Sequence, residues 1–294
     1  MNRRAGRKAP VFLRRAVFCC IALLLFPCCR SRGPSKPPRG TVKVVSFNIR
    51  SFGPAKMGRP LLAEILADIV SRADIAAVQE LRSLDAGPLE QFMGALAGYG
   101  YALGPREGRG TYKEQFLVIY DREKFSLLGM ESYPDPEDLF ERNPLGLYFK
   151  ASGGFDFILI NNHIKPGDAP REIAALGEAA AWFGGLWEDP DIVILGDLNA
   201  DGAYYDETEL AGIFPESQYS LLIGNEQDTT VAAGNNTYDR IIISAAARED
   251  YSGRSGVWRF GELRGDLESL GIEEREISDH YPVWAEFYSG PDTD

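Results

Sequence analysis

The feature that most constrains the fold is a series of short apolar runs between residues 41 and 288, most of them ending at a polar residue. Alternation with a period of two predicts strands, and apolar spacing of three to four residues predicts helices. We predict strands at 42–49, 75–79, 115–120, 125–130, 145–150, 155–163, 192–195, 238–244 and 282–287, and helices at 61–70, 89–97 and 170–187. Several strands follow one another directly, which argues against a purely parallel βαβ sheet. The pattern favours a mixed α+β sandwich.

The first forty residues differ from the rest in charge, with ten Lys or Arg and no Asp or Glu. An apolar run from Ala16 to Cys29 follows the first basic residues, and a basic stretch rich in Ser, Pro and Gly comes next. A basic start, a short apolar run and a polar spacer are typical of a secretory signal. The run is short for a membrane-spanning helix, which needs about 20 apolar residues. We therefore predict a signal peptide or membrane anchor at 1–29, a polar basic linker at 30–40, and export.

All four cysteines lie in this segment, at Cys19, Cys20, Cys28 and Cys29. The rest of the chain therefore has no disulfide, no thiolate metal site and no catalytic cysteine. The sequence Leu-Phe-Pro-Cys at 25–28 resembles a bacterial lipobox, although its proline is atypical, and it makes Cys28 a candidate for lipidation. A cleaved signal and an uncleaved anchor are the alternatives. We expect a secreted protein or one held at the outer face of a membrane, with membrane contact only through this segment or its lipid.

Residues 41–288 contain no linker-like stretch, so we predict one domain there and a short polar tail at 289–294. Without the ten basic residues of 1–40, the 31 basic residues of the whole chain fall to 21, against 43 acidic ones, a net charge of −22. Such a surface repels nucleic acid at long range and shows no electrostatic footprint for it. Binding of a nucleic acid would require a local patch of Arg and Lys, helped by bound cations.

Polar residues that can carry chemistry lie at the ends of the predicted strands, where rigid elements can hold a site. They are Asn48, Glu80, His163, Asp197, Asn199, Asp239, Asp279 and His280. Each of them alone is more often a turn, capping or solvated residue. The chain has only two histidines, and both belong to this set. The set as a whole therefore favours catalysis.

These residue types fit the hydrolysis of a phosphodiester. The reaction needs a hard cation, for which the carboxylates of Glu80, Asp197 and Asp279 are suitable ligands. It needs a base for the attacking water, and an acid or cation for the leaving oxygen. It also needs hydrogen-bond donors to the phosphoryl oxygens, which Asn48, Asn199 and the histidines can supply. Sequence spacing alone does not show that these groups converge.

Eight segments carry a more specific signal, in a fixed order across residues 42–288. They are Val-Ser-Phe-Asn-Ile-Arg-Ser-Phe-Gly (45–53), Asp-Ile-Ala-Ala-Val-Gln-Glu-Leu-Arg (74–82), Thr-Tyr-Lys-Glu (111–114), Phe-Glu-Arg-Asn-Pro (140–144), His-Ile-Lys-Pro-Gly-Asp (163–168), Gly-Asp-Leu-Asn-Ala (196–200), Thr-Tyr-Asp-Arg-Ile (237–241) and Ile-Ser-Asp-His-Tyr-Pro (277–282). Together they resemble the endonuclease/exonuclease/phosphatase superfamily, and within it deoxyribonuclease I. Gly-Asp-Leu-Asn alone is a weak motif, whereas the ordered series is very specific.

The resemblance implies a four-layer α/β/β/α sandwich of two packed mixed β-sheets. It implies two carboxylate–histidine pairs, Glu114 with His163 and Asp239 with His280, in which the carboxylate orients the imidazole and favours its protonated form. Glu80 would hold Mg²⁺ or Mn²⁺, and the residues around the metal and the scissile phosphate would be Asn48, Asp197, Asn199 and Asp279. The proton of the attacking water would go to His280 or to Asp197.

The resemblance also implies the substrate, because four further residues match positions at which deoxyribonuclease I contacts DNA. They are Arg50, Arg82, Tyr112 and Arg142, and Arg82 and Tyr112 match the two that enter the minor groove. An arginine in the minor groove reads groove width more than sequence. We therefore expect a metal-dependent endonuclease that cuts DNA with little sequence specificity and acts as a monomer.

The sequence departs from this family at its calcium positions. Asp228 and Thr230 resemble part of a structural Ca²⁺ loop, but Ala232 and Gly234 replace oxygen-bearing ligands, and Asn143 stands where the family usually has Glu. A calcium requirement therefore does not follow from the resemblance. Two other functions stay open: a sphingomyelinase or phosphoinositide phosphodiesterase or phosphatase of the same fold, and a catalytically silent binding lipoprotein. The first would be expected to carry an exposed aromatic hairpin, and the second to have lost part of the catalytic set.

Overall fold

Period-two apolar patterning builds two six-stranded β-sheets, which the computed structural model describes within residues 40–292. The first sheet contains, in spatial order, β11 (Tyr251–Val257), β12 (Val283–Tyr288), β1 (Thr41–Phe52), β2 (Ile75–Leu81), β4 (Gln115–Asp121) and β3 (Tyr99–Leu103). The second contains β5 (Phe125–Ser132), β6 (Leu145–Ala151), β7 (Asp156–His163), β8 (Ile192–Asp197), β10 (Asp239–Ser244) and β9 (Tyr219–Leu221). Both sheets are mixed, since β1 is parallel to β2 and β7 is parallel to β8, while the other pairs are antiparallel.

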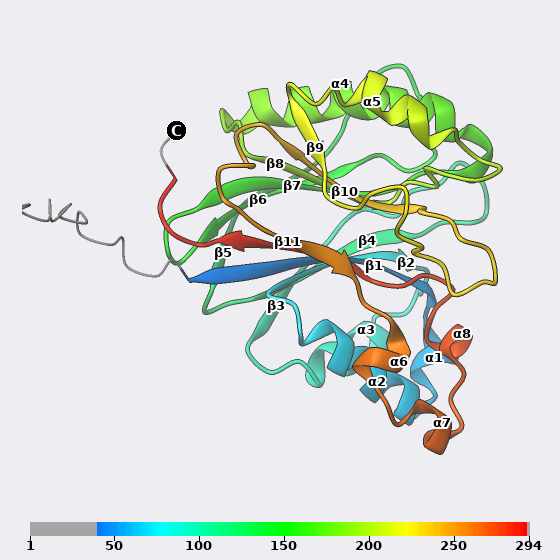
Figure 1. Cartoon of the computed structure of the whole chain (residues 1–294). Coiled ribbons are helices and arrows are strands. Elements are labelled where there is room, and N and C mark those ends of the chain that lie inside the picture. The colour runs from blue at the N-terminus through cyan, green and yellow to red at the C-terminus, as the bar shows by residue number, and fades with distance from the viewer. Residues whose placement is uncertain (1–39, 293–294) are drawn as a thin grey trace, which may run out of the picture. The chain divides into compact units, whose positions relative to one another are not determined.

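The two sheets face each other across a shared apolar core, and helices lie against both outer faces (Figure 1). The second sheet packs with α4 (Ala169–Trp187) and α5 (Leu210–Ile213), next to the short 3-10 turns at Pro166–Asp168 and Glu207–Glu209. The first sheet is covered by α1 (Pro54–Met57), α2 (Pro60–Val70), α3 (Gly87–Gly94), α6 (Phe260–Leu263), α7 (Leu267–Leu270) and α8 (Glu274–Ile277). The predicted four-layer α+β sandwich is confirmed.

Strand alternation also decides where polar side chains meet. In β7, Phe157 and Leu159 pack between the sheets, whereas Ile158 and Ile160 pack toward α4. The alternation continues to the end of the strand, which places His163 on the inter-sheet side. The apolar core therefore gives way to polar side chains at the carboxyl end of β7, and this is where the site is built.

The longest helix, α4, shows why these outer layers form. Pro170 lies in its first turn, where a missing N–H does no harm, and Glu188 ends it with a left-handed φ of 54°. Buried Ile173, Leu176 and Phe183 recur at helical spacing and join the core against the second sheet. Burial of each such side chain contributes roughly 1.5–3 kcal/mol.

Most predicted elements are confirmed, and the differences have physical reasons. The helix predicted at 89–97 is wrong at its end, since α3 stops at Gly94 and the chain turns into β3. The prediction omitted β3, β9, β11 and the short helices. These strands are short or contain Gly and Ser, so their own β propensity is weak and pairing with a neighbouring strand supplies their order.

The predicted signal or anchor at 1–29, most of the predicted linker, and Cys28 lie outside the described residues. They stay predictions. Within residues 40–292, no helix combines the length and apolar character needed to cross a membrane.

Candidate active site

Sheet register places three of the predicted catalytic residues side by side. β7 and β8 are parallel with His163 opposite Asp197, and β8 and β10 are antiparallel with Asp197 opposite Asp239. Because β8 lies between β7 and β10, Asp197 is the middle of three adjacent strand ends. His163 Nε2 lies 3.5 Å from Asp197 Oδ2. Asp197 is buried, as are His163 and Asp239.

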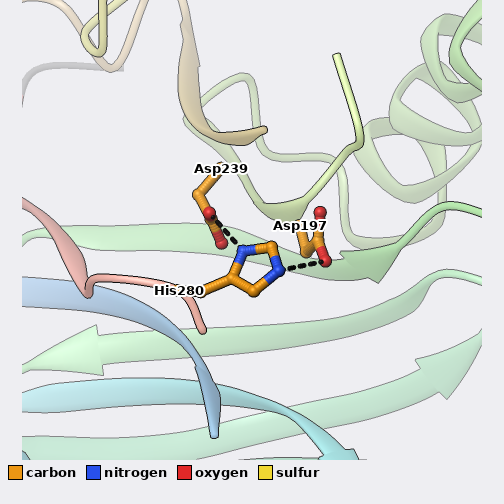
Figure 2. A group of neighbouring side chains, drawn as sticks. All are labelled: Asp197, Asp239 and His280. Carbon is orange, nitrogen blue, oxygen red and sulfur yellow. Dashed lines mark hydrogen bonds and ion pairs between the residues drawn. The ribbon is translucent and has the colours of Figure 1, made fainter. Parts of the chain in front are cut away.

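The second imidazole comes from the other sheet, where His280 precedes β12. Its Nδ1 lies 2.8 Å from Asp239 Oδ2, and its Nε2 lies 3.5 Å from Asp197 Oδ2. Figure 2 shows the ring lying between the two carboxylates. Asp197 Oδ2 therefore faces two imidazoles, one from each sheet.

The other predicted pair, Glu114 with His163, also forms a carboxylate–imidazole contact. Glu114 Oε1 lies 2.5 Å from His163 Nδ1. Arg142 Nε donates to the carbonyl oxygen of His163 at 2.7 Å and lies 3.3 Å from Glu114 Oε1. Arg142, expected at a DNA phosphate, is only 8% exposed, and its Nη2 has no hydrogen-bond partner within the described residues. Its guanidinium therefore lies inside the site, behind this pair.

Two asparagines border Asp197. Asn48 Nδ2 donates to Asp197 Oδ2 at 3.0 Å and to Glu80 Oε1 at 3.2 Å, so its amide bridges two carboxylates. Asn199 donates its backbone N–H to Asp197 Oδ1 at 3.2 Å, and its side-chain Nδ2 to the carbonyl oxygen of Ile164 at 2.8 Å. Both residues lie beside Asp197, but the side-chain amide of Asn199 holds the loop after β7.

Local backbone irregularities turn the site residues inward. Seven described residues other than glycine have positive φ, and four of them surround the site: Arg50, Ser51, Glu80 and Asn199. At Glu80, φ is 67°, and the register of β2 against β4 shifts between Val78 and Leu81. Strict alternation would turn Glu80 toward the helices, so this bulge directs its carboxylate to Asn48. Such backbone costs of order 1–3 kcal/mol per residue and recurs at functional sites.

Two arginines hold the carboxylates predicted to bind metal. Arg82 Nη2 lies 2.7 Å from Glu80 Oε2, and its guanidinium lies 4.1 Å from the centre of the Tyr112 ring. Arg50 Nε lies 3.3 Å from Asp279 Oδ2. Both contacts place positive charge at oxygen donors, so the donor chemistry at Glu80 and Asp279 fits a hard divalent cation.

Among the described residues, the site contains one close group of metal-ligating side chains, with ligand atoms within 4.8 Å of one another: Asp197, Asp239 and His280. Glu80 and Asp279 lie outside this group. The structure therefore links Glu80 to Asp197 through the Asn48 amide, and does not itself bring Glu80, Asp279 and Asp197 to one point.

The segment that resembles part of a calcium loop also supports His280. Val231 N donates to the Asp279 carbonyl oxygen at 2.9 Å, and Thr230 forms an isolated β-bridge with His280. The Asp228 carboxylate accepts from Thr230 N at 2.9 Å and pairs with Arg259 at 3.3 Å. Asp228 and Thr230 thus use protein partners to order the chain beside His280.

Charge at the site follows from these contacts. Burial raises the pKa of Asp197, but the facing His280 and His163 outweigh burial and hold the pKa below its usual value. The same balance lowers the pKa of Glu114, where His163 opposes burial. Burial lowers the pKa of His280, but Asp239 and Asp197 raise it to about 10. Burial also raises the pKa of Asp239, and we place the shared proton on His280 because two carboxylates face it.

Sequence reasoning missed residues that hold the site without reacting. Ser278 Oγ donates to the Asn48 carbonyl oxygen at 2.6 Å, and Lys56 Nζ donates to the Ile277 carbonyl oxygen at 2.7 Å. Both tie the end of β1 to the loop that carries Asp279 and His280. Ser278 lies within the motif at 277–282, which could have drawn attention to it. Lys56 carries no such signal.

An aspartate lies between two carboxylate-paired imidazoles at the strand ends of a four-layer sandwich, and the family match and relatives given below identify the protein as a phosphodiester hydrolase of the nuclease/phosphodiesterase type. The model of the Endonuclease/Exonuclease/phosphatase family matches residues 45–280, and the chain belongs to that family. The resemblance predicted from the eight motifs is confirmed.

Curated relatives point to one branch of the family. Deoxyribonuclease-1-like 2 of Mus musculus is 32% identical over 258 residues, covering 84% of this chain and 91% of that protein. Deoxyribonuclease-1 of Gallus gallus is 31% identical over 260 residues, covering 83% and 91%. Among solved structures, a humanized TDP2 of D. rerio superposes with a TM-score of 0.62 at 15% identity, covering 84% of this chain and 98% of that one. At that identity the structural likeness supports the fold alone.

Proposed function

We propose that the protein is a metal-dependent endonuclease that hydrolyses phosphodiester bonds of DNA with little sequence specificity. The observation that carries the proposal is Asp197 Oδ2, which lies 3.5 Å from both His163 Nε2 and His280 Nε2. This arrangement offers two imidazole N–H groups, one of them on the protonated His280, and one buried anion to a single phosphate and its attacking water. Neutral binding sites have no need of such charges, because burying them is costly.

The roles of the residues follow from their charge. Protonated His280 donates a hydrogen bond to a phosphoryl oxygen or to the leaving oxygen, and Asp239 keeps its ring oriented. His163, oriented by Glu114, faces the same phosphate from the other side. The protonated state of His280 favours Asp197 as the group that takes the proton of the attacking water. Asn48 and Asn199, which both hydrogen-bond to Asp197, lie next to the place proposed for the phosphoryl oxygens.

Mg²⁺ or Mn²⁺ fits the oxygen donors at Glu80 and Asp279, with Asp197 nearby. Such an ion would stabilise the charge that grows on the phosphoryl and leaving oxygens. The two arginines that now pair with these carboxylates, Arg82 and Arg50, would then be free to meet phosphates.

The side chains around the site favour DNA over a lipid. Arg82 stacked on Tyr112 offers a flat cationic surface, and Tyr112 is 61% exposed. Arg50 is also accessible at the rim, and Arg142 lies deeper, behind the Glu114–His163 pair. Relatives named deoxyribonuclease support the same substrate. We also propose that the protein is exported, with Cys28 as a candidate lipidation site, and that it acts as a monomer.

A substrate comparison tests it. The purified full-length protein is incubated with supercoiled plasmid, RNA, sphingomyelin and a phosphoinositide, each with Mg²⁺ and with EDTA. We expect nicked plasmid with Mg²⁺ and none with EDTA. Turnover of either lipid with no nicking would favour the sphingomyelinase or phosphoinositide alternative. Folded, metal-supplied protein without any turnover would favour the silent binding lipoprotein.

A further inference from the structure

The inter-sheet face becomes polar one layer beneath the catalytic residues. Ser46 on β1, Gln79 on β2 and Asn161 on β7 are all 0% exposed. Each lies two positions after a residue of the core between the sheets (Val44, Ala77 and Leu159) and precedes a site residue by one or two positions. We name these three residues the polar layer.

Hydrogen bonds of the polar layer cross from one sheet to the other. Gln79 Nε2 donates to Asn161 Oδ1 at 2.7 Å and to Ser46 Oγ at 3.1 Å. Asn161 Nδ2 donates back to the Val78 carbonyl oxygen at 3.3 Å. Since β2 belongs to the first sheet and β7 to the second, these bonds fix the two sheets against each other directly behind the site.

Stability alone does not explain why the residues of the polar layer are polar. Gln79 Oε1 is buried and has no hydrogen-bond partner among the described residues. A buried amide group without a partner destabilises, whereas apolar side chains of similar shape in place of a hydrogen-bonded pair are nearly neutral. Apolar contacts, however, are not directional and would set no single spacing between the sheets.

We propose that Gln79 and Asn161 are positioning residues, whose hydrogen bond fixes Glu80 on the first sheet relative to His163 on the second. Gln79 directly precedes Glu80 at the bulge in β2, and Asn161 precedes His163 by two residues on the same face of β7. Neither residue contacts Asp197, so both act through their neighbours. The proposal rests on the proposed function, because it concerns the same site.

The first test compares kinetics with stability. Gln79→Met, Asn161→Leu and the double variant remove the bond while keeping volume, and Phe157→Leu is the control in the apolar core. We expect kcat for plasmid nicking to fall roughly 10- to 100-fold in each single variant, as for groups that orient catalytic residues from behind. KM should change less than about twofold, and Tm should stay close to that of the wild-type protein. Because both residues act through one bond, the double variant should lose no more than either single variant.

A second readout does not depend on DNA. The chain has only two histidines, so NMR of protein made without a histidine tag gives two imidazole signals. We expect the His163 signal to shift in Gln79→Met and Asn161→Leu, and not in Phe157→Leu. Unchanged kcat and an unchanged His163 signal would overturn the proposal, as would a kcat loss that tracks Tm in all variants. If the wild-type protein cuts no DNA, the proposed function fails, and the His163 signal still decides the positioning role.

Discussion

Asp197 shows how single residues share charge at this site. A fully buried carboxylate would ordinarily take up a proton, yet two imidazoles facing one oxygen hold the pKa of Asp197 below its usual value. The motifs predicted which residues form the two carboxylate–histidine pairs. They did not predict that Asp197 is the point where both pairs meet, because that follows from strand register.

The charge of His280 can be measured directly. The stabilisation from its pairing with Asp239 and Asp197 is complete below pH 6.5 and is lost as pH rises toward about 10. In metal-free protein, we expect the His280 NMR signal to report a protonated ring above pH 8. Asp239→Asn removes one of the two anions and should lower the pKa of His280, with the His163 signal as the internal control. A His280 that titrates near pH 6.5 in the wild-type protein would contradict these charge assignments.

A second prediction concerns a buried carboxyl group outside the catalytic set. Glu172 Oε1 accepts from Glu141 N at 3.2 Å, and burial raises the pKa of Glu172 to about 7 despite this hydrogen bond and the nearby Arg142. The folded state therefore binds a proton more tightly than the unfolded state, and stability falls as pH rises from about 4.5 to about 7.

The glutamine of the Glu172→Gln variant cannot ionise, so this variant should not lose stability over that pH range. We expect the difference in unfolding free energy between variant and wild type to move in favour of the variant by about 3 kcal/mol between pH 4.5 and pH 8. Urea unfolding at several pH values measures it. A difference that is independent of pH would show that Glu172 is ionised without penalty.

At the scale of elements, the strongly patterned segments were predictable and the irregular ones were not. The 11-residue α2 and the 19-residue α4 follow helical apolar spacing, and the sequence places both within a residue of their bounds. β11 has two glycines and becomes a strand only by pairing with β12. The bulge at Glu80 has no local signature, because the shift depends on pairing with β4.

The backbone at Gly196, which precedes Asp197 within β8, is an element-scale constraint that can be tested. Gly196 has a φ of +144°, and a Cβ there would lie 1.9 Å from the Asn162 carbonyl oxygen on β7. We expect Gly196→Ala to lower the unfolding free energy by at least about 3 kcal/mol, because the backbone must move. Gly185→Ala in α4 is the control, since its Cβ would meet nothing within 4 Å, and it should stabilise by roughly 0.5–1 kcal/mol. Equal effects of the two changes on urea unfolding would rule out this reason for Gly196.

At the scale of the whole molecule, the proposed function requires an acidic protein to bind an acidic polymer. The chain carries a net charge of −12, and the 43 acidic residues all lie beyond residue 40. Long-range electrostatics therefore oppose DNA, and affinity has to come from arginines at the site and from bound cations. This explains why composition alone gave no sign of a nuclease while local motifs did.

Few phosphate contacts imply a shallow salt dependence. With Arg50, Arg82 and Arg142 at phosphates, log(kcat/KM) should fall against log[NaCl] with a slope of about −3 at fixed Mg²⁺. Arg82→Gln should make the slope shallower by about 1. Arg72→Gln should leave it unchanged, since Arg72 pairs with Asp68 on α2. An Arg82→Gln slope equal to wild type would remove Arg82 from the DNA contacts.

The most direct test of the site as one catalytic unit is the plasmid-nicking rate, with Mg²⁺, of His163→Ala, His280→Ala and the double variant beside wild type. Because both imidazoles face one Asp197 oxygen, each single variant should lose roughly 10³-fold or more in kcat. The double variant should be little slower than the slower single variant, since residues that act as a unit are not additive. A folded single variant that nicks DNA at the wild-type rate, or losses that multiply in the double variant, would contradict a shared site.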